Sequence, residues 1–263
     1  MITNLVKVND IEMEYFSFGS GERAFVILPG VSTKSILQSA KAVQAAYKLY
    51  EEEYTVYVFD RRKNMPSCYP VRQMAADTAA VMRHIGISSA DIFGASQGGM
   101  MALCIAIDAP QLVHRLVLGS TTCATDTTVK SVTDRWVALA CSKDRTALTA
   151  ELIECMYSEN TIKQYKDVLL HMNDDMSDDD IERFVIQTKA IDDFDVYGEL
   201  DKISCPTLVI GAEGDKLLPP QHSRRIAKKL GCELYLYGAE YGHCVYDEAT
   251  DYGQRIFNFF QKA

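Results

Sequence analysis

A serine lies between small residues in the stretch "DIFGASQGGMM", at the point where a β-rich run gives way to helix-forming sequence. Gly94 and Gly98 flank Ser96 in a Gly-x-Ser-x-Gly pattern, and glycine permits the tight bend that holds a serine hydroxyl above the end of a sheet. The backbone N–H of Gln97 then lies at a helix N-terminus, where it can stabilise a developing negative charge. This arrangement predicts nucleophilic attack by Ser96 on a carbonyl carbon.

A serine hydroxyl is a weak nucleophile unless a base and an orienting acid lie nearby. His243 follows the run "ELYLYGAEYG" and Asp215 follows "PTLVIGAEG". Both therefore come after predicted strands, where open α/β sheets collect their functional side chains. Glu213, two residues earlier, is the alternative acid. None of the other four histidines follows the carboxyl end of a predicted strand: His84, His114, His171 and His222.

Buried strands alternate with helices up to Ser120, which indicates a parallel sheet covered on both faces. The strand-like runs are "RAFVILPG", "YTVYVFD", "DIFGAS" and "VHRLVLGS". From Thr121 to about Leu200 the periodicity is helical only, and strand-like runs return after it. The sequence therefore predicts an α/β fold with a mostly parallel sheet. Its core is formed by residues 1–120 and 201–263, and residues 121–200 are a helical insertion.

The chain has 27 Lys and Arg against 36 Asp and Glu, a net charge of −9. This balance argues against binding to nucleic acid or to an anionic membrane, because both require a positive field. No 18-residue apolar run predicts a membrane span, and the first residues do not resemble a signal peptide, so we expect a cytoplasmic protein. The eight cysteines are scattered without metal-ligand spacing, so we expect neither disulfides nor a metal.

The order Ser96, Asp215, His243, with "VILPG" near the start and Gly-His after the last strand, resembles the α/β-hydrolase superfamily over essentially the whole chain. This resemblance implies that Ser96 is the nucleophile, His243 the general base and Asp215 the acid that orients it. It also implies an oxyanion hole formed by the backbone N–H groups of Gln97 and Val31. Proline replaces the usual histidine two residues before Val31. The insertion at 121–200 corresponds to the helical cap of the family.

Asp60 begins the string Asp60-Arg61-Arg62-Lys63, where members of the family often carry Asp-x-Arg-Gly as a structural ion pair. We therefore predict a structural role for Asp60 rather than contact with substrate. The context "SQGGMM" resembles the small esterase and enol-lactonase branch. Serine at this position argues against a dehalogenase, and the lack of tryptophan after it argues against a prolyl aminopeptidase.

The predicted activity is hydrolysis of a small carboxylic ester or thioester through an acyl-enzyme on Ser96, without a cofactor. The alternatives are hydrolysis of a lactone or of a C–C bond, a cofactor-free perhydrolase, and a ligand-binding protein of this fold without catalysis. A homodimer is possible. Five residues of the cap are candidates to line an apolar acyl pocket, the alternative being that they pack inside the cap: Trp136, Met156, Tyr157, Phe194 and Tyr197.

Overall fold

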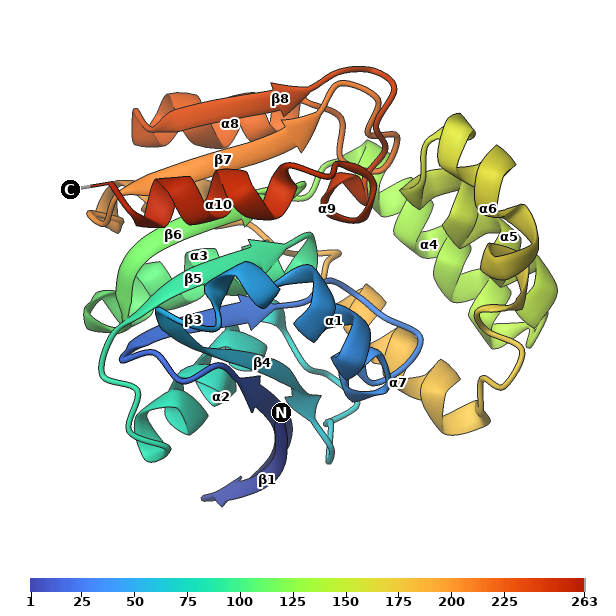
Figure 1. The fold of residues 1–263 in the computed structure, drawn as a ribbon. Coiled ribbons are helices and arrows are strands. Elements are labelled where there is room, and N and C mark those ends of the chain that lie inside the picture. The colour runs from blue at the N-terminus through green and yellow to red at the C-terminus, as the bar shows by residue number, and fades with distance from the viewer. Residues whose placement is uncertain (263) are drawn as a thin grey trace.

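Eight strands form one sheet in the computed structural model, which describes residues 1–262 (Figure 1). The order across the sheet is β1-β2-β4-β3-β5-β6-β7-β8. Strands β3 to β8 run parallel, and β2 is antiparallel to both β1 and β4. The predicted fold, a mostly parallel sheet flanked by helices, is confirmed. The strands are β1 (Ile2–Val8), β2 (Ile11–Phe18), β3 (Arg23–Leu28), β4 (Tyr54–Arg62), β5 (Ala90–Ala95), β6 (Val113–Gly119), β7 (Thr207–Ala212) and β8 (Glu233–Tyr237).

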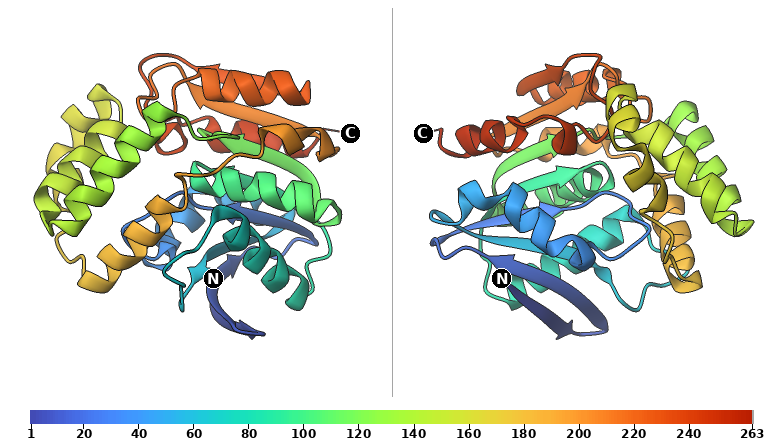
Figure 2. Two further views of the ribbon diagram at one scale, coloured as in Figure 1. Left: turned by 180° about the vertical axis from the view of Figure 1, so that it is seen from behind. Right: turned by 45° about the vertical axis from the view of Figure 1, so that its right-hand side comes forward.

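Helices cover both faces of the sheet, because its central strands are apolar on both sides. In β3, Phe25 and Ile27 point into one hydrophobic core, whereas Val26 and Leu28 point into the other. On one face lie α2 (Val71–His84), α3 (Gln97–Asp108) and α8 (Gln221–Leu230), and on the other lie α1 (Ala40–Ala46) and α10 (Tyr252–Phe260) (Figures 1 and 2). The short helices are η1 (Ile36–Ser39), η2 (Lys48–Tyr50), η3 (Pro110–Leu112), η4 (Tyr197–Lys202) and α9 (Val245–Glu248).

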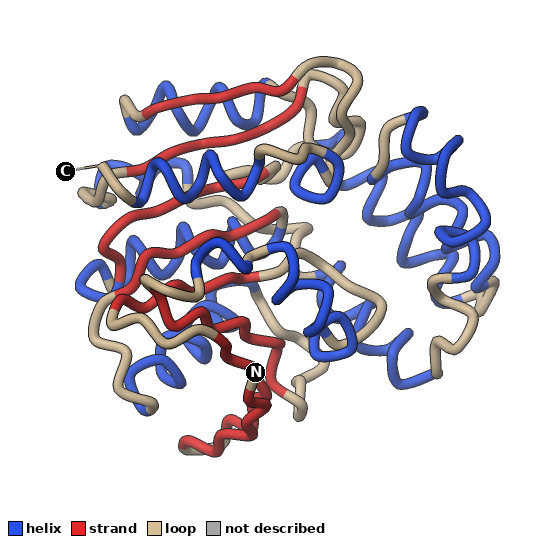
Figure 3. The backbone as a smooth tube through the Cα atoms, in the orientation of Figure 1, coloured by secondary structure: helices blue, strands red, loops and turns tan. Residues whose placement is uncertain are grey.

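Four helices lie between β6 and β7 in the chain and stand beyond the carboxyl ends of the parallel strands (Figure 3). They are α4 (Thr127–Cys141), α5 (Arg145–Met156), α6 (Glu159–His171) and α7 (Asp178–Lys189). Within residues 121–200 the structure describes no strand, only an isolated bridge between Ala124 and Asp195. The division into a core and a cap as separate domains stays a prediction. Among the described helices, none combines the length and the apolar composition needed to cross a bilayer.

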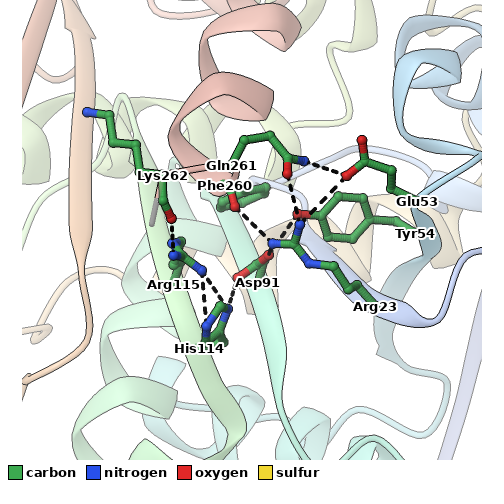
Figure 4. A network of polar contacts seen from close by, with 9 residues as sticks. All are labelled: Arg23, Glu53, Tyr54, Asp91, His114, Arg115, Phe260, Gln261 and Lys262. Carbon is green, nitrogen blue, oxygen red and sulfur yellow. Dashed lines mark hydrogen bonds and ion pairs between the residues drawn. The ribbon is translucent and has the colours of Figure 1, made fainter.

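A polar network ties the amino ends of four strands to the end of α10 (Figure 4). Asp91 at the start of β5 is buried, and its carboxylate accepts hydrogen bonds from Arg23 (2.7 Å) and Tyr54 (2.9 Å). The Nδ1 atom of His114 lies 2.7 Å from the same carboxylate, and Arg23 also donates to the carbonyl of Phe260. This network holds the edge of the sheet opposite to the carboxyl ends of the strands.

Candidate active site

Ser96 occupies the turn between β5 and α3 with φ 52° and ψ −122°. A positive φ at a residue other than glycine costs of order 1–3 kcal/mol, so it persists only where the surroundings impose it. A Cβ atom at Gly94 would lie 2.3 Å from the carbonyl oxygen of Gly98, and one at Gly98 would lie 1.9 Å from the carbonyl oxygen of Leu28. Only glycine fits at these two positions, which explains the Gly-x-Ser-x-Gly pattern in physical terms.

Hydrogen bonds from β6 and α3 hold this turn in place. The backbone N–H of Ser96 donates to the carbonyl of Gly119 at 2.9 Å. The carbonyl of Ser96 accepts from the Thr121 hydroxyl at 2.6 Å and from the N–H of Gly99 at 2.9 Å. The strained backbone is therefore fixed from both sides, and the position of the Ser96 side chain is determined by the sheet rather than by a mobile loop.

His243 and Asp215 form a buried pair in which each side chain is 1% exposed. The Nδ1 atom of His243 lies 2.8 Å from one carboxylate oxygen of Asp215. The other oxygen accepts the backbone N–H groups of Leu217 (2.9 Å) and Leu218 (2.7 Å). With Nδ1 directed at the carboxylate, the remaining ring nitrogen of His243 is available as a base. The alternative acid, Glu213, instead forms an ion pair with Arg224 at the surface.

Two backbone donors next to Ser96 are free. Among the described residues, neither the N–H of Val31 nor that of Gln97 donates a hydrogen bond. The loop after β3 passes directly over the serine, since a Cβ at Gly30 would lie 3.1 Å from the Ser96 Cβ. Both amides are therefore donors without a partner near Ser96, which is the kind of group that an oxyanion hole requires.

A cavity of about 90 Å³ lies between the sheet and the helical insertion. On the sheet side it is lined by Gly30, Val31, Ser32, Thr33, Ser96, Met100, Leu217, Leu218, His243 and Tyr246. On the insertion side it is lined by Val129, Thr133, Trp136, Leu152, Ile153, Met156, Tyr157, Met172, Asn173, Phe184 and Ile191. The side chains of Ser96 and His243 thus face the same cavity, although no hydrogen bond joins them in the described part of the chain.

Three of the five predicted pocket residues line this cavity: Trp136, Met156 and Tyr157. Phe194 and Tyr197 do not, because both follow α7, where the chain returns to the sheet. Phe194 is buried in the main hydrophobic core, and its carbonyl accepts from the N–H of Thr125. Tyr197 is exposed, with the guanidinium of Arg225 4.2 Å above its ring.

Known proteins share this architecture. The family model of the alpha/beta hydrolase fold matches residues 23–139. The solved structure of MGS-M2, an alpha/beta hydrolase enzyme from a Medee basin deep-sea metagenome library, superposes with a TM-score of 0.89 at 21% identity, covering 99% of this chain and 98% of that one. This chain has the α/β-hydrolase fold.

Two further proteins similar to this chain are named as enol-lactonases. The structure of the enol-lactonase from Burkholderia xenovorans LB400 superposes with a TM-score of 0.86 at 18% identity, covering 98% of this chain and all of that one (100%). The 3-oxoadipate enol-lactonase 2 of Acinetobacter baylyi (strain ATCC 33305 / BD413 / ADP1) is 22% identical over 214 residues, which are 78% of this chain and 77% of that relative. At these identities the structural likeness shows the fold alone.

Arg61 is a functional candidate that the sequence did not single out. It is 2% exposed, and its Nη2 donates to the carbonyls of Pro29 (2.8 Å) and Gly30 (3.3 Å) and to the Gln97 side chain (3.0 Å). The Gly30 carbonyl belongs to the same peptide group as the Val31 N–H. Burial lowers the pKa of the Arg61 guanidinium to about 10, which still leaves a buried cation against the loop that carries Val31. The only signal in the sequence was the basic run at the end of β4, Arg61-Arg62-Lys63.

Hydrogen bonds join this part of the sheet to α7 of the insertion. The Gln97 side-chain amide donates to the Gln187 carbonyl at 2.6 Å. Asp60 accepts from the guanidinium of Arg183 at 3.3 Å, and it does not line the cavity. Gln97, the residue after Ser96, is thus connected directly to α7.

Proposed function

We propose that the protein is a serine hydrolase that cleaves a small carboxylic ester or thioester through an acyl-enzyme on Ser96. The observation that carries this proposal is the shared cavity. Ser96 on a strained turn, His243 paired with the buried Asp215, and the free N–H of Val31 all border the same space. No cofactor is needed for this chemistry.

In the proposed reaction, Ser96 Oγ attacks the carbonyl carbon while His243 Nε2 takes the serine proton. The oxyanion accepts hydrogen bonds from Val31 and Gln97, and losing one such donor typically costs about 2.7–4 kcal/mol. His243 then donates its proton to the leaving alcohol or thiol, which departs and leaves the acyl-enzyme. Water, deprotonated by His243, attacks the acyl carbon and releases the acid and free Ser96. Asp215 keeps Nδ1 protonated and stabilises the imidazolium.

The cavity supports a short acyl group. Its volume is about 90 Å³, whereas a cavity of about 150 Å³ holds benzene, with six carbon atoms. By proportion, roughly four heavy atoms fit beyond the reacting carbonyl.

A lactone is the second candidate substrate, favoured by the relatives named as enol-lactonases. A lactone uses the same steps, except that the leaving alcohol stays attached to the acyl group.

The test is hydrolysis of p-nitrophenyl esters from acetate to long chains by wild type and Ser96→Ala, with intact-mass detection of an adduct. The proposal predicts turnover with an optimum at short chains, an acyl adduct on the wild type, and neither in the variant. Equal turnover in both proteins would overturn it. Hydrolysis of lactones alone would favour the second candidate. Cleavage of C–C bonds, peroxide-dependent turnover and binding without turnover are the remaining alternatives.

We also propose a cytoplasmic setting and a small-molecule partner, without nucleic acid. The eight cysteines are free thiols, a state that a reducing compartment maintains. The net charge of −9 also disfavours polyanions. A homodimer stays a prediction.

A further inference from the structure

A second cavity, of about 400 Å³, lies beside the loop that carries Val31. Its wall is formed by residues of β3, β5, α1 and α9, among them Ile27, Phe93, Val43 and Tyr246. A cavity of about 150 Å³ is enough for benzene. The second cavity therefore has room for a small organic molecule.

This second cavity adjoins the cavity next to Ser96. Residues 30–32, which include Val31, line both cavities, and so do Met156, Tyr157 and Tyr246. A molecule in the second cavity would therefore contact the same loop and the same tyrosines as a molecule next to Ser96.

One carboxylate on the wall of the second cavity has no partner. Among the lining residues that the structure describes, Asp247 is the only one with a charged side chain. That side chain is exposed, and the hydrogen bond that Asp247 forms comes from its backbone N–H, which donates to the Cys244 carbonyl at 2.8 Å. The adjacent Glu248, by contrast, accepts the backbone N–H groups of Gly242 (2.6 Å) and Ser158 (2.8 Å). Glu248 thus fastens the loop of His243 to the insertion, whereas the carboxylate of Asp247 is left free.

The charge of Asp247 acts on other side chains of the same wall. Burial, and then the charge of Asp247, raises the pKa of the Tyr47 phenol and of the Cys244 thiol well above their usual values. Desolvation by the wall, together with the charge of Glu248, raises the pKa of Asp247 itself to about 6. At pH 8 the carboxylate is therefore ionised, while the phenol and the thiol are neutral.

The composition of the wall indicates which ligand would fit. An ionised carboxylate that is partly desolvated and lacks a counter-charge is unfavourable, so a cation that enters the cavity gains free energy there. Aromatic rings, whose faces attract organic cations, line the same wall: Tyr47, Phe93, Tyr157 and Tyr246. A metal ion such as Ca²⁺ fits less well, because it requires several oxygen ligands and Asp247 is the single carboxylate on the described wall.

We propose that the second cavity binds a small organic ammonium ion, held by the carboxylate of Asp247 and by the surrounding aromatic rings. The ammonium nitrogen pairs with the carboxylate, and its carbon substituents pack against the rings. The ammonium group has one of two sources, the leaving alcohol of an ester bound at Ser96 or a separate amine ligand.

Two alcohols of one shape test the site: 4-(dimethylamino)butan-1-ol, a cation at pH 8, and its uncharged isostere 5-methylhexan-1-ol. Calorimetry at pH 8 measures the dissociation constant of each compound for the wild type and for Asp247→Asn. We expect the variant to bind the amine about 5- to 30-fold more weakly, between the values typical of an exposed ion pair and of a buried charged hydrogen bond. Its affinity for the uncharged alcohol should not change. An amine that does not bind the wild type, an unchanged affinity for the amine in the variant, or an equal loss for both compounds overturns the proposal.

The matched control is Asp251→Asn, which removes the same charge outside this cavity, where Asp251 forms an ion pair with Arg255. Both affinities should stay at their wild-type values. An equal loss of amine binding in Asp251→Asn would reveal a general attraction to the acidic surface and overturn the site. Asp247→Asn breaks no contact, so its melting temperature at pH 8 should equal or exceed that of the wild type. A lower melting temperature would assign Asp247 a structural role instead.

The acetates of the two alcohols distinguish the two sources of the ammonium group, in a measurement that rests on the proposed function. Each kcat/KM is divided by the rate of hydrolysis in buffer alone. If the ammonium group belongs to the leaving alcohol, the wild type prefers the amino ester and Asp247→Asn loses that preference. If it belongs to a separate ligand, Asp247→Asn weakens binding of the amine and leaves the ratio of the two esters unchanged.

Binding separates this inference from the proposed function, because calorimetry requires no hydrolysis. Binding of the amine that depends on Asp247 supports the inference even if neither ester is cleaved, and the failure then counts against the proposed function alone. Hydrolysis at Ser96 without such binding counts against the inference alone.

Discussion

Replacing Arg61 with methionine tests whether a buried cation supports the oxyanion hole. Methionine keeps most of the apolar stem and removes the donors to Pro29, Gly30 and Gln97. The peptide that carries the Val31 N–H then loses the contact that holds its carbonyl. We expect kcat to fall while KM changes little, because the oxyanion exists in the transition state and not in the bound ester.

The size of this effect has an upper bound. Losing an oxyanion donor entirely costs about 2.7–4 kcal/mol. The Val31 peptide stays in the chain and is displaced rather than deleted, so we expect about 1.4–2.7 kcal/mol, or roughly 10- to 100-fold in kcat. The free energy of unfolding should change by less than about 2 kcal/mol, because hydrogen bonds lost from Arg61 are offset by removal of a buried charge.

The assay measures kcat and KM on a short-chain ester, thermal unfolding, and inhibition by a trifluoromethyl ketone, which forms an oxyanion on Ser96. Its inhibition constant should rise by the same factor by which kcat/KM falls. Arg62→Met is the matched control, because Arg62 is also buried and in β4 but pairs with Asp77 at 3.3 Å and Asp10 at 3.0 Å. An unchanged kcat in folded Arg61→Met, or an equal loss in Arg62→Met, would refute the reasoning.

Three further predictions concern the acid, the distal network and pH. Asp215→Asn removes the carboxylate that orients His243 and should lower kcat by roughly 10⁴-fold with little change in KM. Turnover close to that of the wild type would show that another acid orients His243. Asp91→Asn deprives Arg23 of its buried partner and should lower the free energy of unfolding in urea by about 2–3 kcal/mol, whereas kcat should stay unchanged because the network lies at the opposite edge of the sheet. Burial lowers the pKa of His222 below its usual 6.5, so the unfolded chain binds the extra proton first, and the free energy of unfolding should decrease as pH falls below about 6.5. His222→Gln should flatten that dependence in urea titrations at several pH values, and an identical slope in both proteins would contradict the assignment.

The serine turn could be predicted from the sequence because its information is local. Backbone atoms within a few ångströms leave no room for a Cβ atom at Gly94 or Gly98. The five-residue pattern Gly-x-Ser-x-Gly shows both glycines in the sequence. Apolar runs likewise indicated the strands that end before Asp215 and His243, and the structure places these two side chains 2.8 Å apart. The catalytic roles assigned to them stay predictions for the assays above.

Other parts of the candidate site could not be predicted, because they depend on contacts between distant segments. Trp136 and Phe194 are both buried aromatic residues of the insertion, yet only Trp136 lines the cavity. Likewise, Arg61 and Arg62 are consecutive arginines, and of the two only Arg61 contacts the carbonyls of Pro29 and Gly30.

The sequence by itself determined the alternation of strands and helices, the strained serine turn and the chain order of Ser96, Asp215 and His243, since these follow from local backbone preferences and apolar periodicity. Only the tertiary structure decided which side chains of the insertion face Ser96 and which arginine lies behind Val31. Successive side chains of a strand point to opposite faces, and the rotation of each insertion helix is set by the surface against which it packs.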